Sequence, residues 1–206
     1  MKIGVLGTGM VGNAIASKLV ALGHEVMMGS RTSDNPKAQT WAKTARGTGR
    51  VGTFAETSVF GDMVFNCTQG TGSLAALLAA GAANLDGKIL VDVANVLTRE
   101  GPGLESLGEQ IQKAFPQAKV VKTLNTINCD LMVAPERLSG AHSVFLSGND
   151  TGAKERVRDL LGSFGWKDII DLGDISTARA TEGYVPLWVS LWKQLGTLTF
   201  NINVVR

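Results

Sequence analysis

Residues 7–12 form a Gly-x-Gly-x-x-Gly motif, Gly7-Thr8-Gly9-Met10-Val11-Gly12. The motif follows an apolar run, Lys2–Leu6, that predicts a strand, and it opens a segment, Met10–Leu22, with helical periodicity. This strand–turn–helix context is typical of a dinucleotide-binding site. Gly7 permits the tight turn, Gly9 lets the backbone approach a pyrophosphate, and Gly12 allows the helix and strand to pack closely. The start of the helix adds free N–H groups and a partial positive charge for the phosphates.

Apolar runs alternate with helical patterns along the first 124 residues. This alternation predicts βαβ units, and therefore an α/β protein with a doubly wound, mainly parallel sheet of the NAD(P)-binding Rossmann type. The predicted strands are Lys2–Leu6, Glu25–Met28, Arg50–Thr53, Met63–Cys67, Lys88–Val93 and Lys119–Leu124. The predicted helices are Met10–Leu22, Pro36–Ala45, Phe54–Phe60, Leu74–Ala82 and Leu104–Phe115.

The pattern changes in the last part of the chain. We expect a strand at Ser143–Ser147, a helix at Thr151–Phe164, a short strand at Asp168–Asp171 and a helical segment at Ser176–Leu198. Pro186 predicts a kink or a late helix start in that last segment. No long linker separates the two parts. We therefore predict a Rossmann domain at 1–124 and a small C-terminal α/β extension, 125–206, packed on it.

Composition limits the classes of partner. The chain has 206 residues, is 44% hydrophobic and 18% charged, and carries a net charge of +2. Such a weak positive charge argues against nucleic acid or an anionic membrane as a partner. No apolar run reaches the roughly 18 residues of a membrane span, and the early glycine turn interrupts any signal peptide. We expect a cytoplasmic protein in which Cys67 and Cys129 are free thiols.

The end of the second predicted strand indicates which dinucleotide is bound. NAD-binding proteins usually place an acidic residue there, whereas this strand ends in Gly29-Ser30-Arg31-Thr32. Arg31, with the hydroxyls of Ser30 and Thr32, is suited to a 2′-phosphate, and Lys37 lies on the next helix. The sequence therefore predicts NADP(H).

Three further strand ends are expected at the same edge of the sheet, because parallel strands share that edge. Their polar groups occur in Asn66–Gly70, Asp92–Val96 and Leu124–Cys129, and they are suited to the ribose and carboxamide. No acid/base or nucleophile constellation accompanies them: His24 and His142 lack evident partners, and Cys67 fits a buried strand residue. We predict no catalytic residue and no metal site. Hydride transfer between two bound cofactors requires alignment and little proton chemistry.

The chain resembles the coenzyme F420-dependent NADP oxidoreductases along nearly its whole length. The resemblance rests on Gly7–Gly12, on Leu22–Glu25 leading to Gly29–Arg31, on Val120–Lys122 leading to Asn125–Ile127, and on a closing helix with Glu182, Pro186 and Leu187. It implies NADP contacts at Thr8, Gly9, Met10, Val11, Ser30 and Arg31. It places Thr68 and Asn95 near the ribose, and Asn125, Ile127 and Cys129 around the nicotinamide. It also implies a deazaflavin stacked on the nicotinamide and a homodimer formed through the C-terminal region.

The full predicted cofactor site comprises Gly7, Thr8, Gly9, Met10, Val11, Gly12, Ser30, Arg31, Thr32, Lys37, Cys67, Thr68, Asn95, Asn125, Ile127 and Cys129. The predicted activity is hydride transfer between NADPH and a small-molecule acceptor such as coenzyme F420, FMN or FAD.

Other functions remain open at this point. The plan is shared with the reductase domain of STEAP metalloreductases, which leaves a ferric or quinone reductase as an alternative. A non-catalytic NADPH sensor would also lack an acid/base group. A β-hydroxyacid dehydrogenase or imine reductase is disfavoured, because only about 86 residues follow position 120, too few for a large helical catalytic domain.

Overall fold

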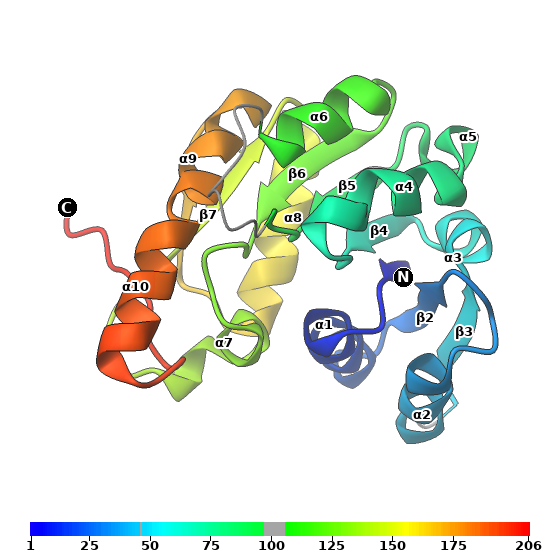
Figure 1. The fold of residues 1–206 in the computed structure, drawn as a ribbon, viewed down its shortest axis with the longest axis horizontal. Helices are drawn as coiled ribbons and strands as arrows, with labels where there is room; N and C mark the ends of the chain where they lie inside the picture. Colours follow the sequence, from blue (N-terminus) through cyan, green and yellow to red (C-terminus); the bar gives the residue numbers. More distant parts are fainter. Residues whose placement is uncertain (46, 97–105) are drawn as a thin grey trace.

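The protein is built on one mixed sheet with the strand order β3-β2-β1-β4-β5-β6-β7-β8 (Figure 1). The computed structural model describes residues 1–45, 47–96 and 106–206. Its strands are β1 (Lys2–Leu6), β2 (Glu25–Ser30), β3 (Gly49–Thr53), β4 (Met63–Asn66), β5 (Ile89–Asp92), β6 (Lys119–Thr123), β7 (Ser143–Gly148) and β8 (Asp168–Asp171). All neighbouring strands are parallel except β6 and β7. The predicted Rossmann-type α/β fold is confirmed.

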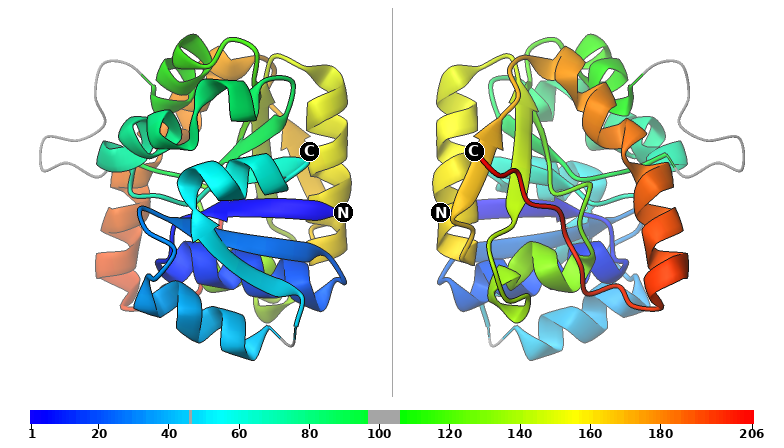
Figure 2. Two further views of the ribbon diagram at one scale, coloured as in Figure 1. Left: turned by 90° about the vertical axis from the view of Figure 1, so that its right-hand side faces the viewer. Right: turned by 90° about the vertical axis from the view of Figure 1, so that its left-hand side faces the viewer.

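Helices cover both faces of the sheet (Figure 2). They are α1 (Met10–Ala21), α2 (Pro36–Thr44), α3 (Phe54–Phe60), α4 (Gly70–Ala80), α5 (Ala82–Leu85), α6 (Leu107–Ala114), α7 (Cys129–Val133), α8 (Thr151–Phe164), α9 (Ala178–Gly183) and α10 (Val185–Leu195), with 3-10 turns η1 (Pro135–Arg137) and η2 (Ile175–Thr177). Among the described helices, none is both long and apolar enough to cross a membrane.

Two apolar cores lie on opposite faces of the sheet. One contains buried residues of α1, α2, α7 and α8, and the other contains buried residues of α4, α5, α6 and α9. Successive residues of a strand contribute to different cores, as the two-residue period of a strand requires. In β4, for example, Val64 faces one core while Met63 and Phe65 face the other. Burial on both faces explains the nearly continuous apolar runs of the central strands.

The C-terminal part of the chain continues the same sheet. β7 pairs antiparallel with β6, with Lys122 opposite Ser147, and β8 then pairs parallel with β7. Helix α8 connects these two strands, and the final residues return to the start of β7, where Ser143 N donates to Ile202 O at 2.9 Å. A boundary at residue 124 between two units stays a prediction.

Several helix boundaries differ from the prediction. Helix α4 begins at Gly70, four residues before the predicted start, and a Cβ on Gly70 would lie only 2.2 Å from the Asn95 carbonyl oxygen. The first turn of α4 is therefore a close packing contact with the end of β5, a long-range contact that periodicity does not reveal. Helix α6 begins at Leu107, and the predicted residues 104 and 105 lie outside the described residues.

The predicted segment Ser176–Leu198 is divided into α9 and α10. Helix α9 ends at Gly183, and α10 begins at Val185 with Pro186 in its first turn. The late helix start predicted from Pro186 is confirmed. Short elements α7 and η1 were absent from the prediction because each spans less than two helical turns and carries no clear period.

Candidate functional site

The glycine turn has the geometry of an anion-binding site. Gly7 has φ +115°, and a Cβ there would lie 2.6 Å from the Cys67 carbonyl oxygen. A Cβ on Gly12 would lie 2.1 Å from the Gly7 carbonyl oxygen, whereas a Cβ on Gly9 would meet nothing within 4 Å. Gly7 and Gly12 are thus required by contacts within the protein, while Gly9 leaves open space beside the turn. This is the division of roles expected of a pyrophosphate-binding turn.

The N-terminus of α1 is open toward that space. Gly9 is the N-cap residue, it provides no side-chain cap, and the first turn contains no acidic residue. The first N–H groups of a helix lack partners within the helix and carry partial positive charge. Met10, the first residue of α1, is 81% exposed, while Val11 is half-buried against the apolar core. The backbone N–H groups of this turn can therefore donate hydrogen bonds to phosphate oxygens.

A cavity of about 920 Å³ joins the glycine turn to the end of β2. Eight of the predicted cofactor residues line it: Gly7, Thr8, Gly9, Ser30, Arg31, Thr32, Cys67 and Thr68. Arg31 is the one charged residue of this lining, and its side chain makes no hydrogen bond or ion pair within the described part of the chain. The Ser30 hydroxyl donates to the Thr32 carbonyl and so shapes the loop around Arg31. The cavity presents a guanidinium and no carboxylate, as a 2′-phosphate requires.

Lys37 lies on the other side of the turn from Arg31. It lines a second cavity, of about 1050 Å³, together with Thr8, Gly9, Met10 and Cys129. Asn35 caps α2 there, because its Oδ1 accepts from the backbone N–H of Lys37 at 3.0 Å. Lys37 thus lines this second cavity and not the one that contains Arg31, and the two cavities share Thr8 and Gly9.

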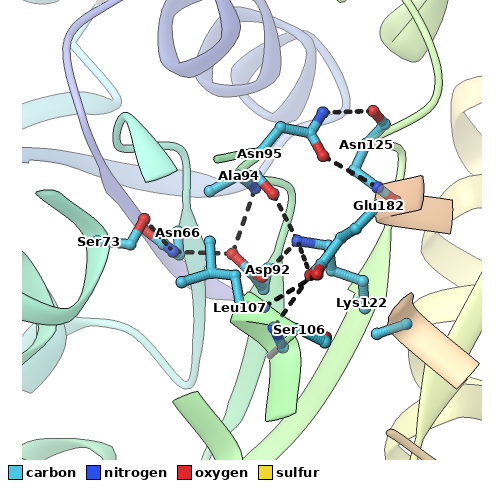
Figure 3. A network of polar contacts seen from close by, with 12 residues as sticks. Asn66, Ser73, Asp92, Ala94, Asn95, Ser106, Leu107, Lys122, Asn125 and Glu182 are labelled. Carbon is cyan, nitrogen blue, oxygen red and sulfur yellow. Dashed lines mark hydrogen bonds and ion pairs between the residues drawn. The ribbon is translucent and has the colours of Figure 1, made fainter. Parts of the chain in front are cut away.

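The ends of β4 and β5 are tied together by side chains (Figure 3). Thr68 Oγ1 donates to Asn66 Oδ1 at 2.6 Å, and Asn66 Nδ2 donates to Asp92 Oδ1 at 2.8 Å. Asn66 also donates to Ser73 Oγ on α4 at 3.2 Å. Thr68, a predicted ribose contact, is thus held in place by a buried amide and a buried carboxylate.

The ends of β5 and β6 meet through a reciprocal amide pair (Figure 3). Asn95 Nδ2 donates to the Asn125 carbonyl oxygen at 2.6 Å, and Asn125 Nδ2 donates to Asn95 Oδ1 at 3.1 Å. Leu124, just before the pair, has φ +61°, which is unfavourable for a residue with a side chain. Backbone strain of this kind is typical of functional sites. Ile127 is buried two residues beyond the pair, and Cys129 begins α7.

A buried charge cluster underlies this end of the sheet (Figure 3). Lys122 Nζ lies 2.8 Å from Asp92 Oδ2, and both side chains are fully buried. The same ammonium lies 3.1 Å from Glu182 Oε1 on α9 and donates to the Ala94 carbonyl. A buried charge needs such partners, because an isolated one is strongly destabilising.

Glu182 also connects α9 to α6. Its carboxylate accepts from Leu107 N at 2.9 Å and from Gly108 N at 3.0 Å, at the start of α6. Lys122, Asp92 and Glu182 were not predicted as a group. A lysine and an aspartate in otherwise apolar strands were the available signal, but their partner on α9 lies about 60 residues further along the sequence.

Neither the thiols nor the histidines are arranged as a nucleophile with its base. Burial, and next the Asp92 carboxylate, raise the pKa of the Cys67 thiol, so it stays protonated at neutral pH. Partial burial also raises the pKa of Cys129. His142 is held by the Pro135 carbonyl at 3.1 Å and by Asn201 at 3.1 Å, and His24 lies beside the N-terminal amine. Both cysteines are free, as predicted.

Comparisons with known proteins identify the family. The family model "NADP oxidoreductase coenzyme F420-dependent" matches residues 2–96. A crystal structure of a protein from Arthrobacter sp. FB24, provisionally assigned as an F420-dependent NADP-reductase, is 48% identical. It covers 100% of both chains with a TM-score of 0.93.

Curated relatives include metalloreductases. Rat STEAP3 is 31% identical over 93% of this chain and 38% of its own length, and human STEAP2 is 28% identical over 99% and 41%. The chain thus spans about two fifths of these relatives. Imine reductase BcSIRED from Bacillus cereus BAG3X2 is 19% identical, with a TM-score of 0.68 over 95% of this chain and 62% of its own, which shows a shared fold. The chain belongs to the coenzyme F420-dependent NADP oxidoreductase family, a family of NADP-dependent oxidoreductases.

Proposed function

We propose that this protein transfers hydride between NADPH and a planar acceptor, coenzyme F420 or a flavin (FMN or FAD), stacked on the nicotinamide. The observation that carries the proposal is the cavity between the glycine turn and Arg31. It combines open helix N–H groups for a pyrophosphate with a guanidinium that has no hydrogen-bond or ion-pair partner among the residues that the structure describes. When bound, NADPH supplies the hydride and the redox chemistry.

The residues around the cavity have separable tasks in this proposal. Backbone N–H groups from Thr8 to Val11 bind the pyrophosphate, and Arg31 with Ser30 and Thr32 binds the 2′-phosphate. We assign Thr68 and Asn95 to the ribose in this proposal. We assign Asn125, Ile127 and Cys129 to the nicotinamide.

Alignment is the main task that the site performs. The amide pair and the Lys122 cluster hold the ends of β5 and β6 at fixed positions, with hydrogen bonds of 2.6–3.1 Å. Hydride transfer between two stacked rings requires close approach and a water-poor surface, and no protein proton donor.

The cofactor assignment is tested by titrating NADPH and NADH into the wild-type protein and Arg31→Gln. We expect NADPH to bind more tightly, and the variant to lose about 10- to 100-fold in NADPH affinity, the range of a charged hydrogen-bonded contact. NADH affinity should stay unchanged. Arg50→Gln is the control, because Arg50 is an exposed arginine on β3 paired with Glu25 at 3.4 Å. Equal affinity for the two cofactors would contradict the proposal.

The acceptor is tested by steady-state NADPH oxidation with F420, FMN, FAD, a quinone and a ferric chelate. Turnover with F420 or a flavin supports the proposal. The metalloreductase names of the STEAP relatives favour a ferric reductase as the second candidate, which faster turnover with the ferric chelate would support, and faster turnover with the quinone would support a quinone reductase. Tight NADPH binding with no turnover would instead support an NADPH sensor.

We also propose a cytoplasmic homodimer that forms through α10. No residue of this helix is buried, and Leu187, Trp192 and Leu195 are 42–55% exposed. Such an exposed apolar face is typical of a protein contact. The free thiols fit a reducing compartment. Sedimentation of wild type and Leu187→Glu tests the dimer, and a wild-type monomer would contradict it.

A further inference from the structure

A second cavity adjoins the one that contains Arg31 and shares part of the glycine turn with it. It runs between α1 and α2 on one side and α7 and η1 on the other, with a volume of about 1050 Å³. Thr8 and Gly9 line both cavities. The groove therefore begins at the pyrophosphate turn and extends down the side of α1 as far as Lys18. At 1.5 Å per residue, the helix axis between Met10 and Lys18 is about 12 Å long.

The groove has a net positive lining. Lys18 on α1, Lys37 on α2 and Arg137 on η1 face one carboxylate, Asp130, so three cations and one anion leave a charge of +2. The side chains of Lys37 and Arg137 make no hydrogen bond or ion pair within the described part of the chain. Lys18 Nζ lies 5.9 Å from the centre of the Phe164 ring, which holds its stem against α8. Three elements thus direct unmatched positive charge toward one elongated space.

The same groove also has an apolar part to its lining. Met10 is 81% exposed there, and Cys129, Val133 and Leu198 contribute further apolar surface. A ligand that fits this lining combines an apolar or ring-bearing part with an anionic part. Deazaflavins and flavin nucleotides with a ribityl phosphate combine these two parts.

We propose that this groove binds the anionic tail of the hydride acceptor, with Lys37 and Arg137 as its phosphate or carboxylate contacts. The inference rests on the proposed function, because it assumes an acceptor stacked on the nicotinamide. The 2′-phosphate of NADPH is the competing use of Lys37. That phosphate already has Arg31, Ser30 and Thr32 in a cavity that Lys37 does not line. The tail is therefore the occupant that the charge distribution favours.

The test compares acceptors that differ only in the tail. Dissociation constants are measured by fluorescence, with NADP+ bound so that no turnover occurs. The pairs are F420 against its riboflavin-level analogue without the phosphate and glutamates, and FMN against riboflavin. The variant is Lys37→Gln/Arg137→Gln. The control is Lys43→Gln/Arg156→Gln, which removes equal charge from exposed positions on α2 and α8 outside the groove.

We expect the wild type to bind the tailed member of at least one pair roughly tenfold more tightly, the range for two partly exposed charge contacts. The groove variant should reduce that ratio to about one, while the control keeps it. If the groove variant loses the preference for the tailed acceptor in both pairs, the groove recognises the phosphate. If it loses that preference only for F420, the groove recognises the glutamate carboxylates. Affinity for tailless acceptors and for NADPH should not change.

Three results would overturn the inference. The first is a wild-type protein that binds tailed and tailless acceptors equally in both pairs. The second is a groove variant that keeps the wild-type preference for the tail. The third is a groove variant with a lower affinity for NADPH, which would mean that Lys37 binds the 2′-phosphate. Failure of the proposed function is seen separately, as absence of NADPH oxidation by the wild type with tailless and tailed acceptors alike. Tailless acceptors that turn over without any preference for a tail would sink the inference alone.

Discussion

The two halves of the site are built in different ways. The half between the glycine turn and Arg31 depends on the backbone of the turn and on a guanidinium only 24 positions after Gly7 in the sequence. The half at the ends of β5 and β6 is formed by side chains, and its cluster joins Asp92, Lys122 and Glu182, 90 positions apart at the extremes. The first half depends on the absence of side chains at glycines, and the second depends on mutual neutralisation of buried charges. Substitutions in the two halves should therefore affect stability and NADPH binding to different extents.

The largest expected effect is on the charge cluster. Lys122→Met leaves two carboxylates near each other without their cation, and Asp92 is fully buried. We expect a loss of about 3–5 kcal/mol in the free energy of unfolding, measured by urea denaturation.

The matched control for this variant lies on the same strand. Lys119→Met removes an exposed pair with Asp150, whose side chains are 44% and 36% exposed, and we expect little change. Equal losses for Lys122→Met and Lys119→Met would show that burial does not distinguish the two lysines.

Gly12→Ala should produce the next largest effect. Its Cβ would lie 2.1 Å from the Gly7 carbonyl oxygen, so the turn or α1 must shift, at about 1–3 kcal/mol of stability. NADPH affinity should fall by about tenfold or more. Gly9→Ala sharpens the comparison, since its Cβ meets nothing in the protein. That variant should keep its stability and lose NADPH affinity, and unchanged NADPH binding by Gly9→Ala would contradict a pyrophosphate at this turn.

Asn95→Ala should have a moderate effect on stability and a larger one on turnover. It leaves the Asn125 amide without its acceptor, at about 1–2 kcal/mol. Because the pair aligns the ends of β5 and β6, kcat should fall more than the affinity for NADPH. Asn84→Ala removes a similar hydrogen bond, 2.7 Å to the Ala80 carbonyl, on α5 before the start of β5. The same change in kcat in both variants would contradict a role of the Asn95–Asn125 pair in alignment.

The smallest expected effect concerns the C-terminal residues. Hydrogen bonds from Arg206 and next from Ser143 hold the pKa of Asp168 below its usual value. A depressed carboxyl pKa stabilises the folded state above the usual value near 4, and that contribution is lost as pH falls below it. Arg206→Ala should therefore slightly reduce stability at neutral pH, and the difference from wild type should shrink below about pH 4. A difference that persists in acid would argue for packing instead of charge.

The Rossmann plan was predictable because local patterns carry it. The alternation of apolar runs and helical periods located β1 to β6 to within about two residues at their ends, and Gly7–Gly12 identified the turn. Arg31 was predictable for the same reason, since it follows a strand end directly. The early start of α4 could not be predicted from such patterns. Its first residue, Gly70, packs against the carbonyl of Asn95, which follows a different strand.

Lys37 shows a limit of reasoning by proximity in sequence. It lies six residues after Arg31, yet the first turn of α2 directs it to the groove beside α1. Asn35 caps α2 at this point, and the sequence alone does not say which cavity a side chain in the first turn of a helix will line.

The sequence by itself determined the fold class, the glycine turn, the basic residue at the end of β2 and the family. These features depend on interactions between residues close in sequence, where glycine geometry and strand or helix period are decisive. Only the tertiary structure decided that Lys122, Asp92 and Glu182 share one buried cluster, that Asn95 and Asn125 pair, and that a basic groove continues from Gly9. The physical reason is that charge pairing and amide pairing act across a few ångströms in space, whatever the separation along the chain.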